Sequence, residues 1–207
     1  MNEKFFDLAK EKQDRIMNAA ISTFARRGYK CASTDEMKAR AGISKGLLFH
    51  YFGDKSSLYG YVCDYSARYV MLEMKQFMGD KDLSYFEMLL SREEAFSDVI
   101  RNYPSMPTFL DSLREEDDSE ALELAEGSVD EYRKFMLDMR MRALDTVKMD
   151  AEDRMILDNT MEFTLSRIRR EAYMREENDF VRVRDEAVSY VKFMKKLVTK
   201  RSVTEFI

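Results

Sequence analysis

The sequence predicts an all-α protein that carries a helix-turn-helix near its amino terminus. Apolar residues recur at helical spacing along most of the chain, and no stretch alternates between polar and apolar residues as a half-buried strand does. Only two prolines and seven glycines interrupt the 207 residues. Two short segments, each with a capping residue of its own, flank a glycine and predict the helix-turn-helix.

The first helix is expected over residues 12–27, because Ile16, Ala20 and Phe24 form an apolar row at helical spacing. Gly28 should end this helix, since glycine enters conformations that other residues avoid. In the helix-turn-helix interpretation, the first helix braces the two short helices that follow.

Those two helices have separate start signals. Ser33 followed by Glu36 is the pattern of a capping box, in which each side chain bonds the other residue's amide, so a helix should begin directly after Ser33. Ala41-Gly42 breaks this helix, and Ser44 is placed to cap a second one over residues 45–51. The second helix carries Lys, His and Tyr beside a small glycine, which suits close approach to a phosphate backbone.

This segment resembles the amino-terminal domain of the tetracycline-repressor (TetR) family of bacterial transcriptional regulators. The resemblance extends over about fifty residues and rests on Ala20, Phe24, Gly28-Tyr29, Ser33, Met37, Ala41-Gly42-Ile43-Ser44-Lys45-Gly46, Leu48, His50-Tyr51-Phe52, Lys55 and Leu58. It implies a helix-turn-helix DNA-binding domain over residues 1–58 and a helical effector-binding and dimerisation domain over residues 59–207.

The DNA contacts are predicted at both helix starts, on the second short helix and at the start of the next helix. The residues are Ser33, Thr34, Ser44, Lys45, Gly46, Leu47, Phe49, His50, Tyr51 and Lys55. Two of them depart from the family pattern. Phe49 lacks the phenolic hydroxyl of the usual tyrosine, and Leu47 can contact a thymine methyl group but cannot hydrogen-bond a base edge.

The charge distribution agrees with a DNA-binding front end. The net charge is -5, yet residues 1–60 hold 11 Lys and Arg against 7 Asp and Glu, a net of +4, and the remainder carries a net of -9. Cys31 and Cys63 lie far apart and predict neither a disulfide nor a zinc site. No leader pattern and no apolar run of about 18 to 20 residues is present, so a cytoplasmic protein without a membrane span is expected.

The remaining chain predicts further helices. Asp54 should cap a long helix that links the two domains and ends at Gly79-Asp80, and Pro104 and Pro107 interrupt the next apolar pattern. The other expected segments are an apolar-periodic run over 83–103, a short helix to Leu113, an acidic loop over 115–118, and helices over 121–147, 151–177 (capped by Asp150) and 179–200 (capped by Asn178).

Two sets of residues are predicted to serve an effector and a second subunit. Methionine and aromatic side chains can line an apolar cavity for a small apolar or amphipathic effector, here Tyr65, Tyr69, Phe86, Phe96, Tyr103, Phe109, Phe135, Met136, Met139 and Phe163. Arginines of the last helices can pair with an acidic effector if they turn inward: Arg140, Arg142, Arg167, Arg169 and Arg170. The homodimer is expected to form a four-helix bundle through Leu157, Met161, Leu165, Ile168, Ala187, Val191, Met194 and Val198.

Catalysis is not expected. His50 is the one histidine, no phosphate-binding loop or HExxH motif occurs, and neighbouring carboxylates such as Glu93-Glu94 and Glu176-Glu177 indicate solvated surface. No metal or cofactor is expected. The predicted function is a ligand-responsive repressor that binds a palindromic operator in double-stranded DNA as a homodimer. The alternatives are a family member controlled by a protein partner, an activator, or a helical enzyme or lipid carrier.

Overall fold

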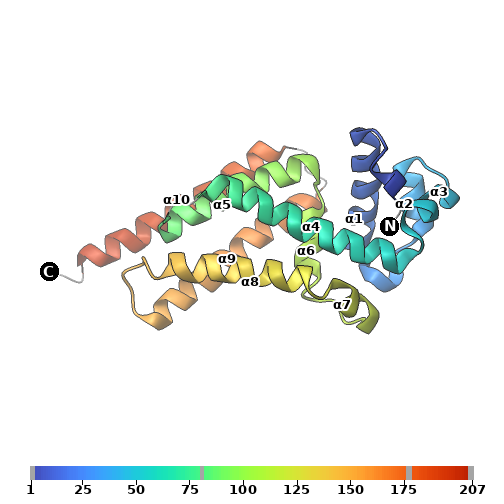
Figure 1. Cartoon of the computed structure of the whole chain (residues 1–207). Helices are drawn as coiled ribbons and strands as arrows, with labels where there is room; N and C mark the ends of the chain where they lie inside the picture. The colour runs from blue at the N-terminus through green and yellow to red at the C-terminus, as the bar shows by residue number, and fades with distance from the viewer. Residues whose placement is uncertain (1–2, 80–81, 176–178, 205–207) are drawn as a thin grey trace. The chain divides into compact units, whose positions relative to one another are not determined.

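The computed structural model describes residues 3–79, 82–175 and 179–204, and it is helical throughout, with no β-strand in these ranges (Figure 1). A 3₁₀ turn, η1 (Glu3–Phe5), precedes the α-helices. These are α1 (Lys10–Cys31), α2 (Thr34–Ala41), α3 (Lys45–Phe52), α4 (Lys55–Met78), α5 (Tyr85–Asn102), α6 (Met106–Ser112), α7 (Ser119–Ala125), α8 (Ser128–Leu144), α9 (Ala151–Met174) and α10 (Phe180–Thr204).

The chain forms two compact units. Unit 1 comprises Met1–Val70 and Val99–Arg133, and unit 2 comprises Met71–Asp98 and Lys134–Ile207. The boundary therefore falls inside α4, α5 and α8 rather than in a linker. The sequence predicts a different boundary, after residue 58, between a DNA-binding domain and an effector-binding and dimerisation domain. This functional division stays a prediction.

Unit 1 is built around the apolar row of α1. Ile16, Ala20 and Phe24 are all buried. The Phe24 ring lies 4.9 Å from that of Tyr59 on α4 in an edge-on contact, and 6.4 Å from that of Phe109 on α6 in a tilted one. These edge-on and tilted contacts brace α1 against two later helices.

Gly28 interrupts α1 without ending it. Its φ of 65° is a left-handed value that glycine tolerates, and one further turn reaches Cys31 beyond the kink. The Tyr29 amide after the kink donates to the Glu116 carboxylate at 3.1 Å. This acidic residue was predicted only as part of a loop, and here it holds the kinked end of α1.

The helix predicted over 121–147 is instead two helices, α7 and α8. Gly127 separates them with a φ of 82°, and Glu126 before it has an extended ψ of 153°. The continuous apolar pattern concealed this break because both helices present apolar residues to the interior, including the buried Ala125 and Val129.

Unit 2 packs parts of α4, α5, α8, α9 and α10, and α9 lies against α10. Asp150 caps α9 as predicted, since its carboxylate accepts from the Asp153 amide at 2.8 Å. Asp179 caps α10 by accepting from the Arg182 amide at 3.0 Å. The predicted cap Asn178 and the end of the predicted helix at Glu177 lie outside the described residues.

Among the described residues, no helix is both long enough and apolar enough to cross a membrane.

Candidate DNA-binding surface and ligand cavity

The turn between α2 and α3 is fixed by local hydrogen bonds. Ser44 Oγ accepts from the Leu47 amide at 3.1 Å, and Ser33 Oγ accepts from the Asp35 amide at 3.2 Å. Gly42 adopts a φ of 62° between the helices. Both predicted caps are therefore present, but the predicted capping box is wrong: Ser33 Oγ accepts from the Asp35 amide rather than from that of Glu36, and the Glu36 carboxylate accepts from Arg40 Nε at 3.1 Å.

The outer face of α3 is exposed to solvent, and the glycine in it has no side chain. Lys45, Gly46 and His50 are exposed, and a methyl group placed on Gly46 would meet nothing within 4 Å. Leu47 and Phe49 are half-buried at the edges of this face. We call Lys45, Gly46, Leu47, Phe49 and His50 the α3 face.

Lys45 is held in place by an acidic neighbour. Its ammonium lies 3.5 Å from Asp35 Oδ1 and 5.9 Å from the centre of the Phe49 ring. Asp35 also pairs with Lys38 at 2.9 Å. The hydrogen bond from Lys38 and the charges of both lysines lower the pKa of Asp35, so this carboxylate is ionised and draws Lys45 toward the start of α2.

The other predicted DNA-binding residues occupy different environments. Tyr51 is buried inside unit 1, and Thr34 is half-buried at the start of α2. Lys55 Nζ donates to the Tyr29 and Lys30 carbonyls at 3.0 and 3.3 Å and lies 4.6 Å from the centre of the Tyr29 ring. Lys55 thus satisfies the carboxyl-terminal carbonyls of α1.

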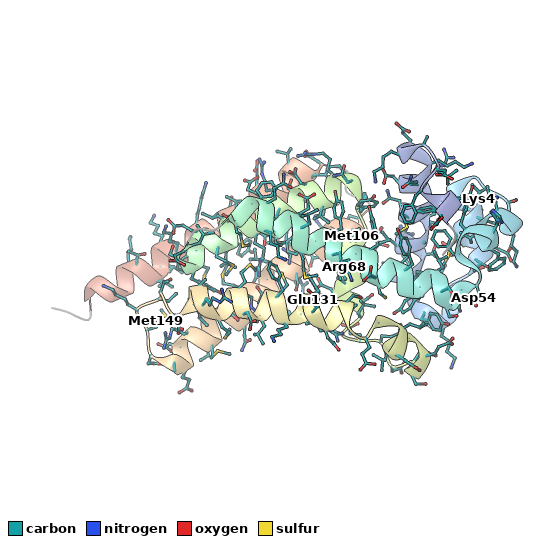
Figure 2. The ribbon with its side chains drawn as sticks, in the orientation of Figure 1. Lys4, Asp54, Arg68, Met106, Glu131 and Met149 are labelled. Atoms are coloured by element: carbon teal, nitrogen blue, oxygen red, sulfur yellow. The ribbon has the colours of Figure 1, made fainter. Side chains whose placement is uncertain are left out.

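Asp54, labelled in Figure 2, is the residue directly before α4, whose first residue is Lys55. Its carboxylate accepts from the Ser57 amide at 2.7 Å and from the Ser56 hydroxyl at 2.9 Å. The predicted cap of α4 is therefore present. These backbone and side-chain hydrogen bonds lower the pKa of Asp54 and keep it charged.

Phe5 is a residue of this region that the sequence pattern did not identify. It lies in η1 with 1% of its surface exposed, and its ring is 5.0 Å from Phe52 and 5.8 Å from Tyr51. The amino-terminal turn therefore packs against the inner side of α3. A single aromatic residue before the first periodic helix gives no spacing signal, although the Phe5-Phe6 pair was visible as an apolar pair.

Unit 2 contains a cavity of about 470 Å³ between the end of α4, the start of α5 and the second half of α8. Its apolar lining consists of Met74, Met78, Leu83, Met88, Phe135, Met139 and Ala143. Charged side chains of both signs line it too: Lys75, Asp82, Asp138 and Arg142. The buried methionines form a deformable apolar interior, and the four charged side chains are exposed at its rim.

The ten predicted effector residues do not gather at one site. Phe135 and Met139 line the cavity, and the Lys75 ammonium lies 5.4 Å from the centre of the Phe135 ring. Phe163 is 67% exposed. The others pack within one unit or the other: Tyr103 and Phe109 are buried in unit 1, where Tyr65 and Tyr69 are half-buried, and Phe86, Phe96 and Met136 are buried in unit 2.

The tyrosines of unit 1 form a polar network instead of a cavity wall. The Tyr65 and Tyr103 hydroxyls are 2.6 Å apart, and Tyr103 donates to the Asp14 carboxylate on α1. Lys10 pairs with Asp14 at 2.7 Å. Burial is the first cause that raises the pKa of Tyr103, so this phenol stays protonated and can donate.

Unit 2 encloses a charged cluster that we call the buried charge cluster. It comprises Tyr85, Arg92, Glu93, Arg140, Asp158, Glu162 and Arg169. Arg92, Glu93 and Asp158 are at most 3% exposed. Glu93 was predicted to be solvated surface and is in fact buried, because its carboxylate accepts from Arg169 Nη1 at 2.8 and 2.9 Å.

Glu162 connects two arginines of this cluster. Its carboxylate pairs with Arg92 and with Arg140 Nη1 at 2.6 Å. Burial alone would raise the pKa of Glu162, but the two guanidinium groups lower it to about 2. Asp158 lies 3.2 Å from Arg140 Nη2, and burial is the dominant cause that raises its pKa. Arg140 and Arg169 thus turn inward, and both pair with carboxylates of the protein itself.

The surfaces of α9 and α10 differ from the predicted dimer face. Five of the eight predicted residues are buried within unit 2, namely Leu157, Met161, Leu165, Ala187 and Val191, and Ile168, Met194 and Val198 are half-buried. The exposed apolar residues lie on other faces of the same helices. They include Ile156, Phe163 and Met174 on α9, at 57%, 67% and 72% exposure, and Tyr190, Phe193 and Leu197 on α10, at 47%, 56% and 47%.

Comparison with known proteins gives consistent matches to DNA-binding regulators. A family model described as bacterial regulatory proteins of the tetR family matches residues 16–62. The uncharacterized HTH-type transcriptional regulator YerO of Bacillus subtilis is 33% identical over 70 residues, 34% of this chain and 24% of that protein. The HTH-type transcriptional activator FasR of Mycolicibacterium smegmatis is 41% identical over 49 residues, 24% of this chain and 22% of that protein. The match thus spans about a quarter of either relative.

Solved structures match over a longer part of the chain. The crystal structure of the transcriptional regulator FadR from Bacillus subtilis in complex with stearoyl-CoA superimposes with a TM-score of 0.57 at 16% sequence identity. The match covers 86% of this chain and 96% of that one. At this identity the likeness establishes a common fold.

Proposed function

We propose that this chain, which belongs to the tetR family of bacterial regulatory proteins, is a ligand-responsive repressor that binds a palindromic operator as a homodimer. The observation that carries the proposal is the α3 face: a short helix, capped at Ser44, whose outer side offers Lys45 and His50 beside the bare surface at Gly46. A bacterial operator lies in the cytoplasm, so the regulator acts there.

The α3 face suits the major groove of DNA. Lys45 can contact phosphate or a guanine edge, His50 offers ring nitrogens, and Leu47 at the margin can contact a thymine methyl group. Gly46 lets the backbone of the helix approach the base edges. Lys55, whose ammonium bonds two carbonyls of α1, contributes by fixing α4 against α1 and is not among the direct contacts we propose.

Specificity for an operator requires two copies of this helix. One short reading helix contacts too few base pairs, whereas a twofold dimer places two of them in successive major grooves about 34 to 36 Å apart. The exposed rows of α9 and α10 supply the apolar surface that such a dimer needs. Ile156, Phe163 and Met174 share one face of α9 because they are seven and eleven residues apart, and Tyr190, Phe193 and Leu197 share one face of α10.

Substitution on the exposed rows tests the dimer without disturbing the core. Phe163→Glu together with Phe193→Glu should give a folded monomer by sedimentation that no longer binds operator as a twofold complex. Leu137→Glu, at a side chain that is 47% exposed on α8, is the matched control and should leave the dimer intact. A wild-type chain that sediments as a monomer at micromolar concentration would rule out the proposed assembly.

The cavity of unit 2 is the proposed effector site. Its volume lies within the roughly 300–1,000 Å³ of small-molecule sites, and its methionine interior favours an apolar or amphipathic ligand. The structural neighbour in complex with stearoyl-CoA supports an effector with an apolar chain and a polar head. An effector that binds one conformation better than another shifts the dimer between operator-bound and released states.

Ligand-dependent stability tests this site. Long-chain fatty acids and their CoA thioesters are the probes, and a binding ligand should raise the melting temperature and release operator DNA. Ala143→Phe fills the cavity and should abolish both effects, whereas Ala39→Phe on the exposed side of α2 should not. Wild-type protein that binds operator but responds to none of the probes would favour a regulator controlled by a protein partner.

Repression, rather than activation, of transcription is also part of the proposal. The relative FasR, which matches 49 residues of this chain, is a transcriptional activator, so membership of the family allows either repression or activation. A reporter placed behind a selected operator should be repressed by this protein, and increased expression would identify an activator. The enzyme or lipid-carrier alternative finds no support among the relatives, which are transcriptional regulators.

A further inference from the structure

Asp35, at the start of α2, joins two lysines of the helix-turn-helix. Its Oδ1 atom lies 2.9 Å from the Lys38 ammonium and 3.5 Å from the Lys45 ammonium. Lys38 is one turn further along α2, whereas Lys45 is the first residue of α3. One carboxylate oxygen therefore connects α2 to the helix that carries the α3 face.

The Asp35 carboxylate contributes little to folding. Its side chain is 59% exposed, and the cap of α2 uses the Asp35 amide, which donates to Ser33 Oγ at 3.2 Å. The start of α3 is held by Ser44, whose hydroxyl accepts from the Leu47 amide. An exposed ion pair and a single charge near a helix start each add little stability. The fold therefore does not explain why a carboxylate stands beside the α3 face.

A negative charge at this place opposes contact with the DNA backbone. Binding without sequence preference depends almost entirely on lysine and arginine contacts to phosphates. To make such a contact, the Lys45 ammonium has to leave Asp35, or the carboxylate has to approach the phosphate together with it. Either event costs free energy, so Asp35 weakens contact between Lys45 and the backbone of any duplex.

A base edge sets a different requirement. An ammonium group has three hydrogens to donate, so Lys45 can direct one toward Asp35 and keep two for the O6 and N7 acceptors of a guanine in the major groove. The Phe49 ring, whose centre is 5.9 Å from the same ammonium, limits its movement on another side. A side chain that is already held in place loses less rotamer freedom on binding. The pair with Asp35 can therefore persist in a complex that reads bases.

We propose that Asp35 is a positioning residue that makes DNA binding by the α3 face more selective. It holds the Lys45 ammonium for a base edge of the operator and withholds it from the phosphates of other sequences. Lys38 shares the carboxylate and keeps the net charge of the three groups positive. This inference rests on the proposed function, because it requires that the α3 face binds DNA.

Anisotropy titrations with an operator duplex, selected from random sequence by the wild type, and with a scrambled duplex test the role of Asp35. Asp35→Asn should bind the scrambled duplex about threefold to fivefold more tightly without tightening operator binding, because one more lysine reaches a phosphate. The logarithmic salt dependence on the scrambled duplex should steepen by about one unit. Asp64→Asn removes the same charge from a carboxylate that pairs with Arg68 at 2.7 Å on α4, and it should bind both duplexes as the wild type does.

Two further backgrounds identify the lysine through which Asp35 acts. The effect of Asp35→Asn on the scrambled duplex should vanish in Lys45→Gln and persist in Lys38→Gln. Asp35→Ser, a second variant without the charge, should behave as Asp35→Asn does, and each variant should melt near the wild-type temperature.

The proposal is overturned if Asp35→Asn changes the affinity for both duplexes equally, or if its effect survives undiminished in Lys45→Gln. Either result leaves DNA binding by the α3 face intact. A wild type that binds no duplex would instead refute the proposed function itself, and this inference with it.

Discussion

The helix-turn-helix and the interior of unit 2 satisfy their polar groups over very different distances along the chain. Ser33 and Ser44 bond amides two and three residues away. In unit 2, Arg92 pairs with Glu162 across 70 residues, and Arg169 pairs with Glu93 across 76. The first region is determined by local sequence, and the second forms only when distant helices have packed.

The largest expected effect is the loss of a charge from the buried charge cluster. Arg92→Leu leaves the three carboxylates of the cluster, Glu93, Asp158 and Glu162, with two arginines, Arg140 and Arg169, and this excess of buried negative charge should lower the free energy of unfolding by about 3–5 kcal/mol. Arg167→Leu removes an exposed pair with Glu171 and should cost less than about 1 kcal/mol. Urea unfolding of both variants measures the difference, and equal losses would contradict the role of burial.

Unit 1 depends on an aromatic contact. Phe5→Ala removes a ring that is 1% exposed and packs on Tyr51 and Phe52, so it should destabilise the protein by about 3 kcal/mol and weaken operator binding. Phe6→Ala changes the neighbouring ring, which is 56% exposed, and should have little effect. Thermal melts and DNA titrations of the pair test whether η1 positions α3. Equal melting temperatures and equal DNA affinities of the two variants would exclude a role of η1 in positioning α3.

The buried charge cluster also predicts a response to acid. Because the pKa of Glu162 in the folded protein is about 2, below its usual value, its stabilising effect is present above pH 4.5 and is lost as the pH falls toward 2. The difference in unfolding free energy between wild type and Glu162→Gln should therefore narrow by about 2 kcal/mol between pH 7 and pH 3. Denaturation at both pH values measures it, and a constant difference would contradict the ion pairs.

A smaller effect is expected at the cap of α3. Ser44→Ala removes the side-chain acceptor of the Leu47 amide, which also donates to the Ser44 carbonyl at 3.1 Å, and should cost about 1 kcal/mol; Ser44→Asp should restore most of this loss. Hydrogen exchange of the Leu47 amide gives the direct measurement. Unchanged protection in Ser44→Ala would show that the backbone bond to the Ser44 carbonyl and tertiary packing, rather than the side-chain cap, fix the start of α3.

These contrasts explain what could be predicted from the sequence. The starts of α2, α3 and α9 were predicted because Ser33, Ser44 and Asp150 act on their own next turn. The apolar periodicity of α9 and α10 was also correct, but periodicity does not state which apolar face meets the protein's own core. Leu165 and Val191 face inward, while Phe163 and Phe193 are exposed on the same two helices.

The candidate sites also differ in whether local sequence or distant parts of the chain determine them. Lys45, Gly46 and His50 lie on the exposed side of α3, where the spacing of a capped helix predicted them. The cavity could not be located from methionine and aromatic content, because identical residue types build solid core at Phe86 and Phe96 and a cavity wall at Phe135 and Met139. The break at Gly127 and the burial of Glu93 likewise depend on partners distant in the chain.

Substitution of Gly46 tests the central claim, that the α3 face binds DNA, most directly. A side chain at Gly46 enters open space, and replacing a helical glycine should stabilise the protein by about 0.5–1 kcal/mol. Gly46→Glu also places a negative charge on the α3 face. Thermal melts should show that Gly46→Glu melts no lower than the wild type. Fluorescence anisotropy with a duplex selected from random sequence should show that Gly46→Glu loses DNA binding, while Gly46→Ala retains most of it. Wild-type affinity in Gly46→Glu would contradict the account.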